Sequence, residues 1–298
     1  MSTDTDTDAD LAVAVAPPIS RPAPPQDLPF VRIQASRGWL PIKMKELWDH
    51  RELMYFLAWR DVTIRYKQTV FGATWAVIQP FMTMVAFSLI FGQLAKIPSD
   101  GVPYPIFSYT ALLPWNYFAT ALAKSSNSLV GSQNLISKVY FPRLILPVAS
   151  VLPALLDFAI AFVVLLGMMV YYGISPTPAI ALLPALVVVA MMCALGCGLW
   201  LSALNVEYRD VGYIVPFLTQ LWMVATPVAY PSSLLEQPWL TLYGLNPMVG
   251  VVEGFRWALL GTNPPGILIP LSAGVSFLLL ISGAFYYRRA ERTFADIA

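Results

Sequence analysis

The chain has 298 residues, of which 57% are hydrophobic and only 12% are charged, and its formal net charge at pH 7 is +1. A soluble domain of this composition lacks the polar groups to cover its own surface, so the composition predicts an integral membrane protein. The near-zero net charge, with no run of Lys and Arg interleaved with aromatic residues, excludes nucleic-acid binding.

The sequence has no motif for catalysis or metal binding. His50 is the one histidine, and Cys193 and Cys197 are the two cysteines, so no zinc-ligand set can be assembled. The cysteines lie four residues apart in an apolar stretch and are interpreted as small apolar filler rather than as a disulfide. No glycine-rich phosphate loop and no Ser/His/Asp arrangement can be traced. The chain is therefore not expected to hydrolyse ATP alone or to hold a cofactor or a metal.

Residues 1–38 alternate Thr and Asp and then become rich in proline. Such a segment cannot bury enough apolar surface to offset the entropy of ordering it. It also lacks a basic region followed by a long apolar region, so it does not read as a signal peptide. We expect a disordered cytosolic tail.

Residues 39–69 are too charged to span a membrane but form an amphipathic pattern. One apolar stripe at helical spacing comprises Met44, Trp48, Tyr55, Trp59, Val62 and Tyr66. Trp and Tyr favour the bilayer interface, so the pattern predicts a helix in the cytoplasmic headgroup plane. A second, narrower stripe comprises Leu53, Leu57 and Ile64. This stripe either packs on the protein's own loops or makes the helix a gate and a docking surface for a cytosolic partner.

Six uncharged or nearly uncharged stretches in residues 70–290 predict an all-α membrane domain, because about 20 apolar residues span the ~30 Å hydrocarbon core. They are Val70–Ala95, Tyr104–Ala123, Leu144–Tyr172, Ala179–Leu204, Val211–Tyr230 and Ile267–Tyr287. Pro105 and Pro114 interrupt the second, although spans tolerate such breaks when neighbouring helices satisfy the freed backbone. A further apolar piece, Trp239–Gly261, contains Glu253 and is expected to form short re-entrant or interfacial helices.

The positions of the cations predict the orientation of these spans. If the amino terminus is cytoplasmic, all but two of the 18 Lys and Arg residues fall on the inner side, and the exceptions are Lys96 and Arg256. One missed helix would invert every later loop, so this asymmetry supports six spans with both ends inside. Residues 291–298 then form a cytosolic carboxyl-terminal tail.

Two features inside the predicted spans concern packing. Ala190, Ala194, Gly198 and Ser202 recur every four residues, which predicts close helix association within or between subunits. Asp157 is the one ionisable residue within a span, and a carboxylate in lipid is a functional hypothesis by default. A proton relay would need a counter-charge in neighbouring spans, and none is present there. A hydrogen-bonded packing residue is therefore the preferred interpretation.

Several longer motifs run from the amphipathic segment to the last span. They are Leu47-Trp48, Arg51-Glu52-Leu53, Phe56-Leu57-Ala58-Trp59-Arg60-Asp61, Arg65-Tyr66-Lys67-Gln68-Thr69, Gly72, Trp75-Ala76, Gln79-Pro80, Leu113-Pro114-Trp115, Asn134-Leu135-Ile136, Lys138-Val139-Tyr140-Phe141-Pro142-Arg143, Tyr208-Arg209-Asp210-Val211, Thr226-Pro227-Val228 and Leu245-Asn246-Pro247-Met248, with Glu253 and Arg256. Together they resemble the permease subunits of ABC-type polysaccharide exporters, in the ABC type-2 permease family, over roughly residues 44–290. Such exporters move O-antigen, capsule or teichoic-acid polymers.

The resemblance implies a homodimer that binds two copies of a separate ATPase subunit, which supplies ATP and Mg²⁺. The cytoplasmic loop Gly131–Pro147 would be the coupling helix, and its ATPase-coupling residues would be Asn134, Lys138, Tyr140, Phe141, Pro142 and Arg143. An ordinary hairpin loop with interfacial aromatics is the alternative. The gate helix would present Trp48, Arg51, Glu52, Trp59, Arg60 and Asp61. The short loop Asn205–Gly212 also lies inside, and its charges either contact the partner or cap the neighbouring spans.

The expected function is the channel-forming subunit of an exporter of lipid-linked polysaccharide in a bacterial inner membrane. Arg60, Arg65 and Lys67 combine positive charge with membrane depth, so they are candidates for binding a lipid diphosphate, with positive-inside anchoring as the competing explanation. Pore-lining candidates are Trp75, Phe81, Phe87, Tyr230 and Trp239, although such aromatics also face lipid. The alternatives are an ABC exporter of a small molecule or drug and, in another class, a membrane-embedded glycosyltransferase or lipid-modifying enzyme.

Overall fold

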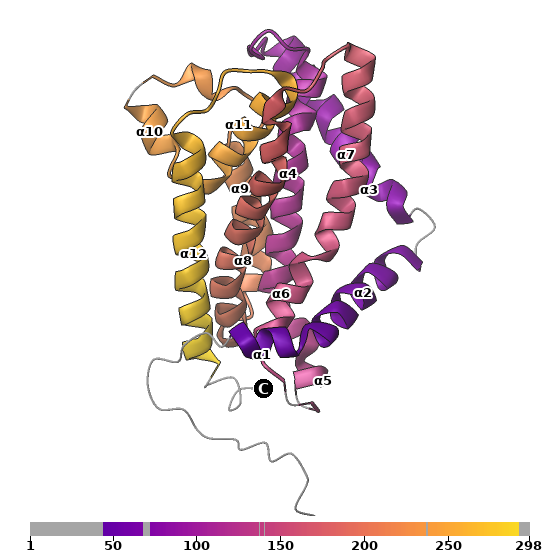
Figure 1. Cartoon of the computed structure of the whole chain (residues 1–298), viewed down its shortest axis with the longest axis vertical. Helices are drawn as coiled ribbons and strands as arrows, with labels where there is room; N and C mark the ends of the chain where they lie inside the picture. Colours follow the sequence, from indigo (N-terminus) through magenta and orange to yellow (C-terminus); the bar gives the residue numbers. More distant parts are fainter. Residues whose placement is uncertain (1–43, 68–71, 137, 140, 237, 292–298) are drawn as a thin grey trace, which may run out of the picture. The chain divides into compact units, whose positions relative to one another are not determined.

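The computed structural model describes residues 44–67, 72–136, 138–139, 141–236 and 238–291 (Figure 1). Every regular element in these ranges is a helix, so the predicted all-α class is confirmed for the described residues. The tail expected over residues 1–38 and residues 292–298 lie outside the described residues, and so does Tyr140 of the predicted coupling loop.

The long helices follow the predicted apolar stretches. They are α3 (Gly72–Phe87), which continues as the π-helix η1 (Ser88–Leu94), α4 (Tyr104–Ser126), α6 (Ile145–Val151), α7 (Pro153–Tyr172), α8 (Leu183–Glu207), preceded by the 3₁₀-helix η3 (Pro178–Leu182), α9 (Val211–Val224) and α12 (Leu268–Ala290). Shorter helices are α1 (Met44–Asp49), α2 (Arg51–Lys67), η2 (Val130–Ser132), α5 (Gln133–Ile136), η4 (Ser232–Leu234), α10 (Trp239–Tyr243) and α11 (Pro247–Leu260).

Four helices of the described chain are long and apolar enough to cross a membrane. They cover Thr74–Leu94, Ile145–Tyr172, Pro178–Glu207 and Leu268–Ala290. The helix predicted over Val211–Tyr230 ends earlier, at Val224, and its 14 residues extend only about 21 Å at 1.5 Å per residue. The second predicted span is a helix as well, but most of its residues are buried by neighbouring helices.

Helix α4 runs unbroken through both of its prolines. Pro105 lies in the first turn, where a helix needs no N–H donor, and Pro114 lies in a stretch that is buried by neighbouring helices. Burial also explains why α4 tolerates polar residues such as Ser108 and Thr110, whose hydroxyls donate to carbonyls within the helix at 3.1 and 2.8 Å. The third predicted span, in contrast, is divided at Pro153, which has no N–H to continue α6 into α7.

The small-residue stripe of α8 is a packing seam inside the subunit. All four of its residues are buried, and a Cβ added at Gly198 would lie 2.3 Å from the Ser125 hydroxyl oxygen of α4. On another face of α8, a Cβ at Gly196 would lie 2.6 Å from the Leu280 backbone nitrogen, and one at Gly283 of α12 would lie 2.4 Å from the Gly196 carbonyl oxygen. The small-residue pattern predicted the seam that faces α4 but not the seam that faces α12.

Candidate functional site

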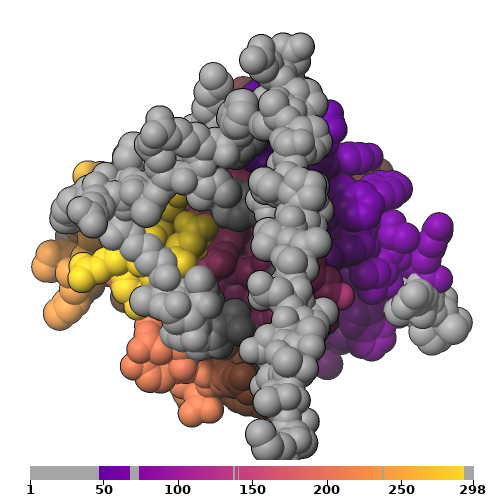
Figure 2. Space-filling model, turned by 90° about the horizontal axis from the view of Figure 1, so that it is seen from below, coloured from indigo at the N-terminus to yellow at the C-terminus, as the bar shows by residue number. Residues whose placement is uncertain are grey.

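Short segments gather at one end of the bundle, here called the α2 end. It holds α1, α2, the loop between α4 and α6 that contains α5, the turn after α8, and the end of α12 (Figure 1). Viewed onto this end, the α2–α3 segment lies on one side and the end of α12 on another (Figure 2). The opposite end, here called the α11 end, holds α10 and α11. Of the Lys and Arg residues in the described ranges, only Lys96 and Arg256 belong to the α11 end.

Helix α2 has one face on the protein and one face away from it. Leu57 is only 3% exposed and packs in a buried cluster with Phe141, Ile145 and Tyr287, which belong to the loop, α6 and α12. The outward face carries the aromatic residues Tyr55, Phe56 and Trp59, all more than half exposed, and Trp48 of the preceding helix α1 is exposed to a similar degree. The predicted second stripe therefore does pack on the protein's own elements through Leu53 and Leu57. Ile64 is an exception because it is 54% exposed.

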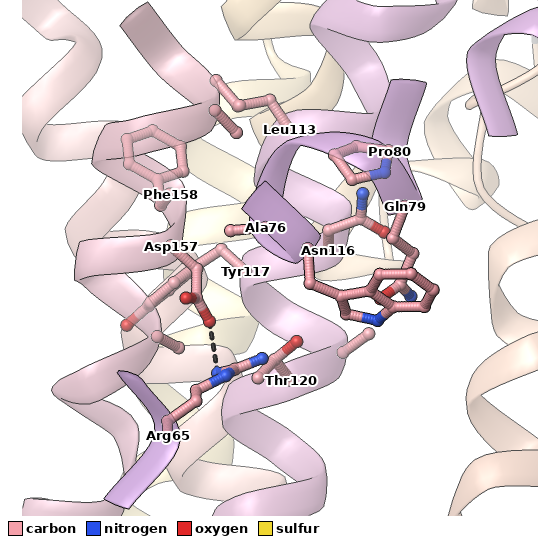
Figure 3. A pocket seen from close by; sticks show the side chains of 14 residues that line it. Arg65, Ala76, Gln79, Pro80, Leu113, Asn116, Tyr117, Thr120, Asp157 and Phe158 are labelled. Carbon is pink, nitrogen blue, oxygen red and sulfur yellow. Dashed lines mark ion pairs between the residues drawn. The ribbon is translucent and has the colours of Figure 1, made fainter. Parts of the chain in front are cut away.

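Asp157 of α7 binds the carboxyl-terminal turn of α2. Arg65 forms an ion pair with this carboxylate (Figure 3). The Tyr66 hydroxyl donates a hydrogen bond to it. Burial and the hydrogen bond to Asp157 raise the pKa of the Tyr66 hydroxyl well above its ordinary value. The counter-charge for Asp157 thus comes from the amphipathic helix and not from a neighbouring span. Tyr66 accordingly points inward, away from the aromatic stripe to which the sequence pattern assigned it.

The other predicted gate residues lie on the exposed part of α2. Arg60 pairs with its neighbour Asp61, with 2.8 Å between Nη2 and Oδ1. The Arg51 guanidinium lies 5.7 Å from the centroid of the Trp48 ring. Glu52 and Lys67 are exposed. Among the predicted lipid-diphosphate candidates, Arg60 and Arg65 therefore already have carboxylate partners.

The loop between α4 and α6 is anchored at its base and exposed at its tip. Phe141 is buried, and the Tyr287 hydroxyl of α12 donates to the Arg143 carbonyl oxygen at 2.9 Å. Pro142 is half-buried. Asn134 and Lys138 lie at the exposed tip. This combination of a buried root and an exposed tip suits a connector that a partner grips from outside.

A second connection ties this loop to the turn after α8. The Asn205 side-chain amide donates to the Ser126 carbonyl oxygen at 3.1 Å and to the Asn127 side-chain oxygen at 3.0 Å. The charged residues of the turn, Glu207 and Arg209, are exposed. The link between Asn205 and Asn127 was missed in the sequence, because two asparagines 78 residues apart carry no pairing signal.

At the α11 end, Arg256 of α11 is fully buried. Its guanidinium donates to the carbonyl oxygens of Val228 at 2.8 Å and of Tyr230 at 3.3 Å. It also pairs with Glu253 at 3.1 Å and lies 3.6 Å from the Phe107 ring centroid. These contacts fix the segment that follows α9 against the bundle.

The predicted pore-lining aromatics do not form one group. Trp75 and Phe81 are exposed on α3, and Phe87 packs edge-on against Phe91 with 5.3 Å between ring centroids. Tyr230 and Trp239 lie at the α11 end, where the Tyr230 hydroxyl contacts that of Tyr243 at 2.9 Å. Within the described ranges, no cluster of His, Cys, Asp or Glu could hold a metal ion.

Comparison with known proteins identifies a family and several similar proteins. Residues 52–260 match the ABC-2 type transporter family. The chain is 30% identical, over 258 residues, to the O-antigen export system permease protein RfbA of Myxococcus xanthus, covering 85% of this chain and 98% of that protein. It is 25% identical over 247 residues to the protein of the same name from Klebsiella pneumoniae, covering 83% and 95%. It is 24% identical over 224 residues to the inner membrane transport permease YadH of Escherichia coli K12, covering 70% and 84%.

The match covers α2 from its second residue and the whole loop between α4 and α6. The similar proteins are permeases, which are transport subunits rather than enzymes, and the four apolar helices fit a multi-pass membrane protein. The chain therefore belongs to the ABC-2 type transporter family as a membrane permease subunit related to O-antigen exporters.

Proposed function

We propose that this chain is the channel-forming subunit of an ATP-driven exporter of lipid-linked polysaccharide, of the O-antigen, capsule or teichoic-acid type. The observation that carries the proposal is the similarity to an O-antigen export permease over 98% of that protein's length. An ABC exporter of a small molecule or drug is the second candidate. The inner membrane transport permease of E. coli, matched at lower identity and lower coverage, has no polysaccharide in its name.

The motor would be a separate ATPase, present in two copies, that docks at the α2 end. The exposed loop tip around Asn134 and Lys138 is the contact we assign to it. Movement of that tip would pass through Phe141 into the buried cluster that also holds Leu57 of α2 and Tyr287 of α12. A displacement of the loop tip would therefore move the gate helix α2 and the last helix α12 together.

The functional unit would be a homodimer in a bacterial inner membrane, with six spans per subunit and both termini cytoplasmic. Exposed amides support a protein-facing surface, because Gln79 of α3 and Gln220 of α9 interrupt faces that are otherwise apolar. Trp75 and Phe81 share the exposed side of α3 and would line the glycan path between the two copies. The external segment 227–266 would close it from outside.

The lipid diphosphate of the substrate would meet α2 at Arg60, Arg65 or Lys67. Lys67 is the strongest of the three candidates, because the other two already pair with Asp61 and Asp157. A diphosphate would have to compete with those carboxylates.

The test is deletion of the gene in its host followed by labelling of surface polysaccharide. We expect glycan to be lost from the surface and to accumulate inside, and the wild-type gene to restore export. Lys138→Glu should abolish both rescue and co-purification of the ATPase, whereas Lys96→Glu, the same charge change at the α11 end, should rescue. Normal surface glycan in the deletion strain would refute the proposal.

A further inference from the structure

Helix α3 does not continue to the end of its span as an α-helix. It passes into the π-helix η1, and directly after η1 the Ala95 amide donates to the Ile90 carbonyl oxygen, five residues earlier, at 2.9 Å. Each bond of this kind spans one residue more than the bond of an α-helix. π-Helices are rare, and most of them are single-turn insertions into α-helices, frequently at functional sites. The position of η1 is therefore a candidate for a functional role.

Packing against neighbouring helices does not account for η1. None of its residues is buried, and Leu89, Ile90 and Leu94 are 49–80% exposed. Gly92 makes a close contact, because a Cβ added there would lie 2.9 Å from Tyr104 Cγ of α4. Segments with few buried apolar contacts change conformation at low cost in free energy. The π-helix can therefore bend without disrupting a buried core.

The part of α3 that leads into η1 is also weakened as a helix. Pro80 has no N–H to donate within the helix. The Thr83 hydroxyl donates to the Gln79 carbonyl oxygen at 3.0 Å, and the Ser88 hydroxyl donates to that of Met84 at 2.7 Å. Side-chain bonds to the carbonyl four residues earlier slightly destabilise a helix and often bend it. These features favour bending in the same part of the span as η1.

The chain beyond η1 is fixed to the α11 end. The Ser233 hydroxyl donates to Asp100 Oδ1 at 2.9 Å, and the Tyr104 hydroxyl donates to the Ala229 carbonyl oxygen at 2.5 Å. Ala229 belongs to the segment that the buried guanidinium of Arg256 holds through two carbonyl oxygens. The loop after η1 and the first turn of α4 are thereby joined to a segment whose main contact is buried.

The chain before η1 leads to the α2 end, where the contacts are partly exposed. Helix α3 begins beside α2 and runs towards the α11 end (Figure 1). The last turn of α2 is held by the ion pair of Arg65 and Asp157, whose side chains are 40% and 17% exposed. A partly exposed pair separates at less cost than a buried one. A force applied at the α2 end would therefore displace α3 more readily than the segment beyond η1.

We propose that η1 is a hinge about which α3 swings relative to the loop after η1 and the α11 end. The swing would carry the exposed side of α3, with Trp75 and Phe81, while the contacts beyond η1 stay in place. A bend of about 20°, the lower limit of a sharp helix kink, would move the start of α3 by about 8 Å, because its 16 residues extend about 24 Å. That an ATPase drives the swing, and that a glycan passes beside α3, rest on the proposed function.

Distances between two spin labels, measured by double electron–electron resonance in nanodiscs, test the hinge. The full chain carries Cys193→Ala and Cys197→Ala and is diluted with an excess of unlabelled chain, so that most complexes hold one labelled copy. The first pair of labels joins Thr74→Cys, at the start of α3, to Leu245→Cys at the α11 end. The comparison pair joins Ala95→Cys, directly after η1, to the same Leu245→Cys. All three labelled positions are exposed.

In the chain alone, we expect a broad distance distribution for the Thr74 pair and a narrow one for the Ala95 pair. With the ATPase bound, ATP and vanadate should shift the Thr74 distance by about 8 Å and leave the Ala95 distance unchanged. Deletion of Leu89 removes one residue from η1 and allows α-helical bonds throughout, so it should narrow the Thr74 distribution and abolish the shift. Leu89→Ala keeps the number of residues and is the matched control, which should behave as the parent chain.

Equal widths for the two pairs in the chain alone would overturn the hinge, and so would equal narrowing by Leu89→Ala and by the deletion. If the deletion variant does not fold, the comparison of the two pairs in the undeleted chain decides the question. A broad Thr74 distribution that ATP does not shift supports the hinge and counts against the proposed ATP drive. Normal glycan export in cells together with equal widths would reject the hinge alone. A hinge found in the labelled chain without any glycan export would reject the proposed function.

Discussion

Removing the Asp157 carboxylate tests whether it holds α2 in place. Asp157→Ala deletes the ion pair to Arg65 and the hydrogen bond from Tyr66 at once. The side chains of the ion pair are 40% exposed for Arg65 and 17% exposed for Asp157, so the pair itself contributes only about 1 kcal/mol. A hydrogen bond to a charged carboxylate adds about 1.5 kcal/mol or somewhat more. We therefore expect the docked state of the last turns of α2 to lose about 2–3 kcal/mol.

Hydrogen exchange measured by mass spectrometry reports this loss of docking free energy in α2 directly. Amides of α2 that exchange through local undocking should speed up by about 30- to 150-fold, because 1.4 kcal/mol is a factor of ten in an equilibrium constant. Amides of α4 should not change. Tyr66→Phe, which keeps the ion pair, should give an intermediate increase.

Asp61→Asn is the matched control, since Asp61 pairs with its exposed neighbour Arg60 on the same helix. Its effect should stay within about twofold. The reasoning fails if Asp157→Ala leaves exchange in α2 within twofold of wild type. It also fails if α4 accelerates as much as α2, because the variant would then destabilise the whole bundle rather than release one helix.

Three further predictions concern stability, measured as thermal unfolding in detergent. Leu57→Ala should cost about 2–5 kcal/mol because Leu57 is buried, whereas the same change at exposed Ile64 should stay within about 0.5 kcal/mol. Arg256→Lys should destabilise by about 2 kcal/mol or more, since an ammonium cannot reproduce the fork of donors to two carbonyls and a carboxylate. Gly196→Ala should cost about 1–3 kcal/mol by overpacking. Gly167→Ala, which meets nothing within 4 Å, should be neutral or stabilising.

The apolar stretches were enough to predict the helices but not all of their limits. A helix-length run of uncharged residues has few other solutions in a membrane, which is why all six stretches are helical. The end of α9 at Val224 was not predicted, because it depends on packing rather than on composition. Asn246 accepts from the Trp222 indole at 2.9 Å and donates to the Ala225 carbonyl at 3.1 Å. Those contacts replace the helical hydrogen bonds that would have continued to Tyr230.

The sequence was enough to predict which segments form the candidate site, but not which of their side chains contact one another. Trp48 and Trp59 face outward as the interfacial pattern predicts, and Leu57 faces inward. The partner of Asp157 was missed because the search for a counter-charge covered only the spans. An interfacial helix packed on the end of a span can supply that charge from outside the apolar stretches. Arg65 does so here, 92 residues earlier in the chain.

The two ends of the bundle hold their short segments by ion pairs of different strength, and this difference bears on which end moves. At the α2 end the pair is partly exposed, so separating Arg65 from Asp157 exposes both groups to solvent at modest cost. At the α11 end Arg256 has no exposed surface, and separating it from Glu253 would leave two charges buried, at roughly 3–5 kcal/mol. A motor that grips the α2 end would therefore release α2 first, while α11 and the segment bound to Arg256 stay fixed. Opening at the α11 end would require α11 and the segment bound to Arg256 to move together as a rigid body, because the contacts between them cost more free energy to break.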